Sequence, residues 1–168
     1  MSKFLNVYHG FNPETTGANA VSYFWGLMTI GGILGLVLMK LFDSKVILRW
    51  FTMIAMICVL LGLIGSDQVS LWAFPISGFF LSVMYPVIVS LGLNSVSKHH
   101  GSFAGILMTG IAGGAVVQLL IGAISDLFSL KVGMVFLFIT LGYILSISYW
   151  ANPLIRNKTI SFSGKKEE

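Results

Sequence analysis

Five long stretches of this chain contain no aspartate, glutamate, lysine or arginine, and these residues occur only between the stretches and at the chain ends. The stretches are residues 15–39, 50–66, 68–97, 99–125 and 132–155. Because an α-helix rises ~1.5 Å per residue, ~20 apolar residues cross a hydrocarbon core ~30 Å thick. Four stretches exceed that length, and 50–66 reaches it when Arg49 extends toward the lipid headgroups. The pattern therefore predicts five membrane-spanning helices.

Composition supports the same fold class. Hydrophobic residues make up 56% of the chain and charged residues 10%, which is unlike an ordinary soluble domain. We predict an all-α integral membrane protein, because a helix pairs its own backbone polar groups inside a bilayer. The expected spans are residues 18–39, 47–65, 71–94, 102–124 and 132–151. They form one five-helix bundle (18–151), which follows the outer end of a truncated helix with an extracellular loop (1–17) and precedes a basic cytoplasmic tail (152–168).

The basic residues are distributed unequally between the two sides of the predicted membrane. One side carries Lys40, Lys45, Arg49, Lys98, Arg156, Lys158, Lys165 and Lys166, whereas the other carries Lys3 and Lys131. Cytoplasmic loops hold the lysine and arginine excess in membrane proteins. The sequence thus predicts a multi-pass protein of the inner (plasma) membrane, with its N-terminus outside and its C-terminus in the cytoplasm. The net charge of +4 is explained by topology, and no nucleic-acid partner is expected.

The sequence offers no residues for catalysis or for a cofactor. It contains no HExxH, Walker A or nucleophile-elbow motif, and no Cys/His spacing typical of zinc sites. The single cysteine, Cys58, lies inside the second predicted span and is expected to be a small core residue. No carboxylate lies within a predicted span, so no proton relay is evident. We therefore expect no enzyme activity, no metal and no cofactor.

Polar and aromatic residues at the start of the first span form one candidate binding site. Asn19 and Tyr23 are four residues apart and share a helix face, with Trp25 two residues further on. An amide beside aromatic rings suits sugar stacking and hydroxyl recognition. The alternative is an aromatic belt at the membrane interface.

A second candidate site lies around the middle of the third span, where Tyr85 precedes Pro86. Proline removes a backbone donor and kinks the helix about one turn earlier. Broken helices beside polar side chains mark substrate sites in many transporters. A kink with no ligand contact is the alternative.

The fourth span places Gln118 within the hydrocarbon region, among Gly110, Gly113, Gly114 and Gly122. A buried amide needs a partner, which is either a neighbouring helix or a polar cavity. Glycines in a membrane helix favour close packing or a bend. The pair Gly31 and Gly35 in the first span is a GxxxG motif, for which ordinary helix packing and a dimer face are the two interpretations.

Three segments resemble a known transporter family when they are taken in order. They are 30–48 (IGGILG, LMKLF, KVIL), 79–92 (FF, YP, SLG) and 113–126 (GGAVV, GAISD). Together they are similar to the fucose/proton symporter family of the major facilitator superfamily, and the resemblance covers about residues 17–150. Two positions depart from the family pattern: Gly32 replaces an arginine, and Gln118 replaces a proline.

The resemblance implies twelve helices in two six-helix bundles, of which this chain matches helices 8 to 12, with residues 2–7 as the end of helix 7. It implies a C-terminal fragment of a secondary-active sugar transporter, coupled to protons or another cation in the full-length protein and not competent alone. The expected partners are the lipid bilayer, a small sugar and the missing N-terminal half. Substrate contacts are expected at Asn19, Tyr23, Trp25, Tyr85 and Gln118. The alternatives are a small helical membrane scaffold or accessory protein, and a fragment of an efflux-type transporter of the same superfamily.

Overall fold

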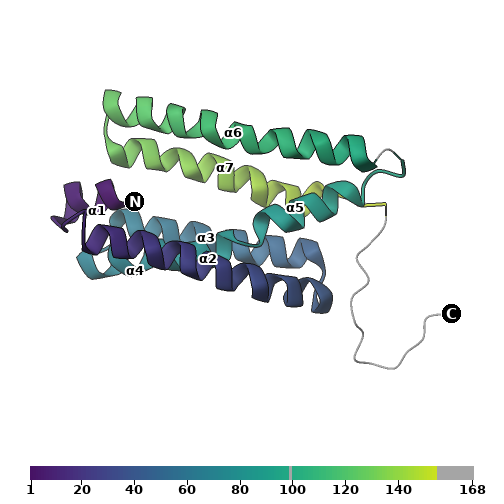
Figure 1. Cartoon of the computed structure of the whole chain (residues 1–168), viewed down its shortest axis with the longest axis horizontal. Helices are drawn as coiled ribbons and strands as arrows, with labels where there is room; N and C mark the ends of the chain where they lie inside the picture. The colour runs from purple at the N-terminus through teal and green to yellow at the C-terminus, as the bar shows by residue number, and fades with distance from the viewer. Residues whose placement is uncertain (99, 155–168) are drawn as a thin grey trace.

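The computed structural model describes residues 1–98 and 100–154, and every regular element in this part of the chain is an α-helix (Figure 1). The helices are α1 (Ser2–His9), α2 (Thr16–Leu41), α3 (Ser44–Ile64), α4 (Asp67–Leu81), α5 (Met84–Leu93), α6 (His100–Leu127) and α7 (Leu130–Trp150). Five segments are long and apolar enough to cross a membrane: α2, α3, α4 with α5, α6 and α7. The prediction of an all-α membrane protein with five spans is confirmed. Of the expected tail, residues 155–168 lie outside the described part.

Helices α3, α4 and α7 begin before the predicted starts because charged residues lie in or just before their first turns, which a charge-free stretch excludes. Asp67 is the first residue of α4, where a carboxylate suits the positive end of the helix dipole. Asp43 caps α3, and its side chain accepts a hydrogen bond from the Lys45 backbone N–H at 2.8 Å.

The third span is broken where the sequence predicts a kink. Helix α4 ends at Leu81 and α5 begins at Met84, so Ser82 and Val83 separate them. Pro86 has no N–H to donate to the Ser82 carbonyl, and its ring crowds that carbonyl. The break therefore lies one helical turn before the proline.

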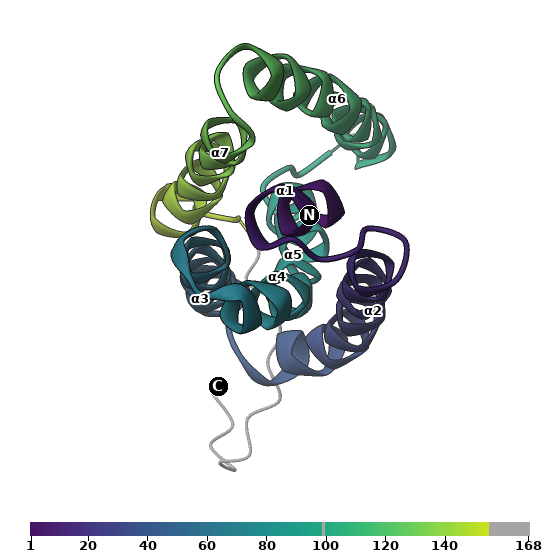
Figure 2. The ribbon, with the colours of Figure 1, turned by 90° about the vertical axis from the view of Figure 1, so that its left-hand side faces the viewer.

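Helix α4 packs most closely on α3 and on α2, which barely contact each other, while α7 packs on α3 and α6 packs on α7 and α5. Figure 2 shows this arrangement end-on, with α1 over the middle of the bundle. The core is apolar, and Leu48 and Ala55 of α3 and Val83 and Val87 near the helix break are all completely buried. Helices α3 and α4 thus pair as one hairpin and α6 and α7 as another, α2 packs on α4, and α3 joins the two groups.

The GxxxG motif of α2 is an internal packing surface. A Cβ atom placed on Gly31 would lie 2.5 Å from the Phe79 carbonyl oxygen, and one on Gly35 would collide with Val83. Both neighbours belong to the α4–α5 span, so the glycines let two backbones approach within one chain. Ordinary helix packing is therefore the correct interpretation of this motif.

The short helix α1 covers one end of the bundle. Phe4 and Leu5 are completely buried, and the Phe4 ring meets Phe74 edge-on at 5.3 Å. The helix ends at Gly10, whose left-handed φ of 67° favours glycine. His9 Nδ1 lies 2.6 Å from Asp67 Oδ1 at the start of α4, so α1 is tied to the bundle by apolar and polar contacts.

At the other end of the bundle, α3 is joined to the last turn of α7. Lys45 Nζ and an Arg49 Nη each donate to carbonyl oxygens of α7, those of Tyr149 and Ser148, at 3.5 Å. The Arg49 guanidinium also lies 4.1 Å from the centre of the Tyr149 ring. Cations suit the negative end of a helix dipole. We call this end, where Lys40, Lys45, Arg49 and Lys98 lie, the basic end, and the opposite end the α1 end.

Candidate functional site

Two aromatic rings from different helices form a platform near the α1 end. Tyr23, in the second turn of α2, stacks on Trp72, in the second turn of α4, with ring centroids 6.0 Å apart and planes inclined by 9°. Each of these residues is 53% exposed. The stack therefore leaves aromatic surface available to a further flat group.

A small cavity of about 120 Å³ adjoins this stack. Its walls are Thr16, Asn19, Ala20, Tyr23, Leu71 and Trp72. Ala20 is buried and lets α2 lie close to α4, while Asn19 and Tyr23 occupy successive turns of one α2 face. The cavity thus combines a hydroxyl, an amide and two aromatic side chains, with no ionisable carboxylate or amine in its walls.

The structure brings together Asn19 and Tyr23 of the five predicted site residues. It adds Trp72, which is not among the predicted site residues. The sequence offered no signal for this role, because the approach of Trp72 to Tyr23 depends on how α2 and α4 pair.

Trp25 lies on a different face of α2. Two residues correspond to ~200° around a helix, so Trp25 points away from the Tyr23 side. Its ring meets Phe24 edge-on, with the centroids 5.7 Å apart, and it is 60% exposed. The structure does not bring Trp25 into the cavity.

Tyr85 faces α6 instead of α2. Its hydroxyl lies 3.6 Å from the Met108 sulfur, and this contact joins the start of α5 to α6. Methionine sulfur is a weak acceptor, so the Tyr85 hydroxyl keeps capacity for a stronger partner.

Gln118 is exposed, and it makes no hydrogen bond with any residue in the described part of the chain. It lies ten residues after Met108 on α6, or ~15 Å further along the helix. The surrounding glycines are open too, since a Cβ atom on Gly110, Gly114 or Gly122 would meet nothing within 4 Å. This face of α6 therefore has no neighbour among the described helices.

Ionisable groups near the α1 end offer no metal site within the described residues, where no cluster of three or more His, Cys, Asp or Glu side chains occurs. The closest pair is His9 with Asp67, and Lys131 Nζ lies 4.6 Å from the centre of the Tyr8 ring nearby. These contacts attach α1 to α4 and α7 and leave the aromatic cavity uncharged.

The chain is similar to curated bacterial transporters. It is 31% identical over 131 residues to a glucose/galactose transporter of Brucella abortus, which covers 78% of this chain and 32% of that protein. It is 33% identical over 120 residues to the L-fucose-proton symporter of Escherichia coli, covering 68% of this chain and 27% of that protein. A putative glucose/galactose transporter of Helicobacter pylori is 28% identical over 125 residues, covering 74% of this chain and 30% of that protein.

The chain therefore spans about a third of the length of these relatives. No family model and no solved structure matches it. The two named kinds of relative, for glucose/galactose and for L-fucose, agree with the family that the ordered motifs indicated. The chain is a homologue of these sugar transporters, and its resemblance to the fucose/proton symporter family is confirmed.

Proposed function

We propose that this chain forms helices 8 to 12, the C-terminal part, of a secondary-active sugar transporter that couples uptake to protons or another cation. The observation that carries the proposal is the similarity to transporters of glucose, galactose and L-fucose over 67–78% of the chain. In this proposal the protein lies in the inner (plasma) membrane, with the basic end in the cytoplasm and the α1 end outside. The unequal distribution of lysine and arginine supports that orientation.

The aromatic cavity supplies the sugar contacts of this part. A pyranose ring presents C–H groups on its faces, which pack on the Tyr23 and Trp72 rings, while its hydroxyls bond the Asn19 amide. The uncharged walls suit a neutral sugar. Tyr85, Gln118 and Trp25 are exposed on other faces, where we propose that they meet the sugar or the second bundle.

The second bundle is the partner that this proposal requires. Alternating access needs two bundles that rock about a central site, and this chain supplies one of them in part. An apolar cavity of about 320 Å³ lies between α2, α3, α4 and α7, lined by Met1 and by Phe24, Val59, Phe74 and Met134 among others. Its size and lining suit side chains of a further transmembrane helix.

The test is galactose counterflow in proteoliposomes. We expect counterflow when the chain is combined with the complementary N-terminal part of the B. abortus relative, and none with the chain alone. Tyr23→Ala should lower galactose affinity about two- to tenfold, since an aromatic contact contributes ~0.5–1.5 kcal/mol beyond its area burial. Tyr23→Phe, which keeps the ring, is the matched control.

Three outcomes would contradict the proposal. Counterflow by the chain alone would show that no second bundle is needed. A folded combination that binds no sugar but exports an apolar dye would favour the efflux alternative. A combination that carries neither kind of compound would favour the scaffold alternative.

A further inference from the structure

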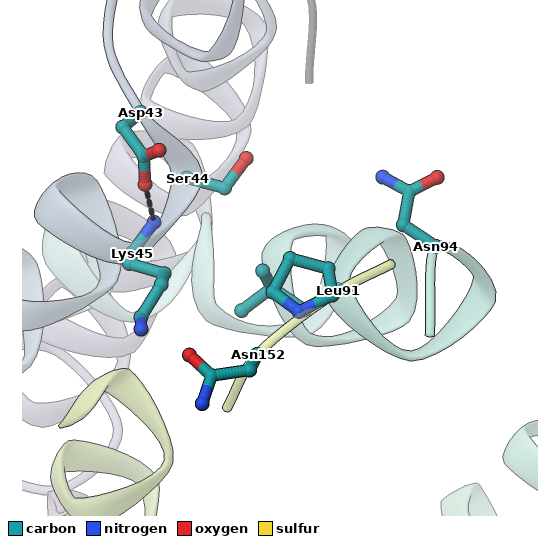
Figure 3. Close-up of a pocket in the computed structure, with 7 residues that line it drawn as sticks. Asp43, Ser44, Lys45, Leu91, Asn94 and Asn152 are labelled. Atoms are coloured by element: carbon teal, nitrogen blue, oxygen red, sulfur yellow. Dashed lines mark hydrogen bonds between the residues drawn. The ribbon is translucent and has the colours of Figure 1, made fainter. Parts of the chain in front are cut away.

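A hollow lies at the basic end, at the opposite end of the bundle from the aromatic cavity, and Figure 3 shows the side chains that line it. Its volume is about 430 Å³, within the ~300–1,000 Å³ typical of small-molecule pockets. It is lined by Asp43, Ser44, Lys45, Leu91, Asn94, Asn152 and Pro153. The walls thus come from three separate places: the turn before α3, the end of α5 and the segment after α7.

Five of the seven lining side chains can form hydrogen bonds, and they differ in kind. Asp43 uses Oδ1 to accept the Lys45 backbone N–H, which leaves its other oxygen as an acceptor. Lys45 donates from Nζ, and its contact with the Tyr149 carbonyl is long at 3.5 Å. Ser44 is buried in the wall, being 4% exposed, and Asn94 and Asn152 carry amides that both donate and accept. Donors and acceptors therefore surround one space.

The charges in the walls balance. Asp43 is negative and Lys45 positive, so the lining itself carries one charge of each sign. A phosphate would meet the Asp43 carboxylate, and an ammonium would meet Lys45. Leu91 and Pro153 add apolar surface between the polar groups. The lining matches a neutral molecule that carries many hydroxyls on a compact carbon frame.

We propose that this hollow, here named the basic-end pocket, is a second binding site for a neutral polyhydroxylated molecule of monosaccharide size. The inference rests on the proposed function in sugar transport and deepens it. The aromatic cavity and the basic-end pocket lie at opposite ends of the bundle, so a sugar would be held once on entry and again on release into the cytoplasm. Asn152 is the residue that recognises its hydroxyls.

The experiment is protection of a single cysteine from N-ethylmaleimide in the 168-residue chain in micelles. Pro153→Cys in a Cys58→Ala background places the thiol in the pocket wall without removing a hydrogen-bonding side chain. Galactose at ten times its dissociation constant should slow the reaction about tenfold, because about one site in eleven stays empty. Leu154→Cys is the matched control, since Leu154 is adjacent, 70% exposed and outside the lining. Its rate should not change.

Adding Asn152→Ala to Pro153→Cys should abolish protection by galactose, whereas phosphoethanolamine should never protect. Equal rates with and without galactose in the Pro153→Cys variant would overturn the proposal. Protection by phosphoethanolamine would overturn it as well, because that result would assign the pocket to a phospholipid headgroup.

A second labelled position separates this inference from the proposed function. Thr16→Cys, in the same Cys58→Ala background, places a thiol in the wall of the aromatic cavity. If galactose protects the Thr16→Cys variant but not the Pro153→Cys variant, the aromatic cavity is supported as a sugar site and the basic-end pocket is rejected.

Discussion

Two glycines in α2, three residues apart, meet opposite surroundings. Gly35 faces Val83 so closely that any side chain would collide, whereas a Cβ atom on Gly32 would meet nothing within 4 Å. The GxxxG spacing indicated a packing surface at Gly31 and Gly35. The structure shows that this surface packs on the third span, α4 with α5. Nothing in the sequence could show that the partner surface is the break in the third span.

This contrast gives a paired prediction. Gly35→Ala should lower the free energy of unfolding by about 1–3 kcal/mol, because an added methyl in a filled contact forces the backbones apart. Gly32→Ala, the matched control, should leave it unchanged or raise it by up to about 1 kcal/mol through better helix propensity. Unfolding of the chain in mixed micelles measures both. Equal effects of the two substitutions would contradict the packing role of Gly35.

The residues of the candidate site could be predicted from the sequence only in part. Asn19 and Tyr23 were predicted together because their spacing puts them on one helix face, which is a local property. Their neighbour Trp72 lies 49 positions after Tyr23 in the chain, so only the pairing of α2 with α4 brings the rings together. Gln118 was expected to have a partner, but the described residues supply none.

Among the elements, the third span departs most from a regular helix, and one residue explains the departure. Pro86 accounts for the break at Ser82 and Val83. The sequence predicted this break because the effect of proline acts within one turn. The two halves, α4 and α5, contact different neighbours: α4 packs on α2 and α3, and α5 packs on α3 and α6.

Replacing Pro86 with alanine should let α4 continue into α5. The new N–H can then bond the Ser82 carbonyl, so backbone amides between Val83 and Val87 should exchange hydrogen more slowly in the variant. Pro75→Ala is the control, because Pro75 lies inside α4 without breaking it and its replacement should leave exchange around Ser82 unchanged. Unchanged protection in Pro86→Ala would show that tertiary contacts, and not the proline, set the break.

For the whole molecule, the sequence was sufficient for the number of spans and insufficient for their arrangement. The thickness of a bilayer fixes how many apolar residues a span needs, so charge-free stretches located all five helices. Which helices touch depends on contacts distributed over the entire chain. Lipid is as apolar as leucine, so apolar faces alone do not reveal their partners.

The orientation of the whole bundle in the membrane can be tested by cysteine labelling. Asp67→Cys and Lys98→Cys, each made alone in a Cys58→Ala background, place a thiol at exposed positions on opposite ends of the bundle. In intact cells an impermeant thiol reagent should label the Asp67→Cys variant, whose thiol lies at the α1 end. The Lys98→Cys variant, with its thiol at the basic end, should stay unlabelled until the membrane is opened. The reverse pattern would overturn the expectation drawn from the lysine and arginine distribution.

The pairing of the helices also sets an order of assembly during synthesis. Helices α2, α3 and α4 follow one another in the chain and α4 packs on both of the others, so the three can form a packed unit before the ribosome completes α6. The last hairpin joins this unit mainly when α7 reaches α3, because α6 packs only on α5 and α7 among its main contacts. Until then α6 packs mainly on α5. We therefore expect the chain to be most susceptible to membrane proteases in the interval between insertion of α6 and docking of α7.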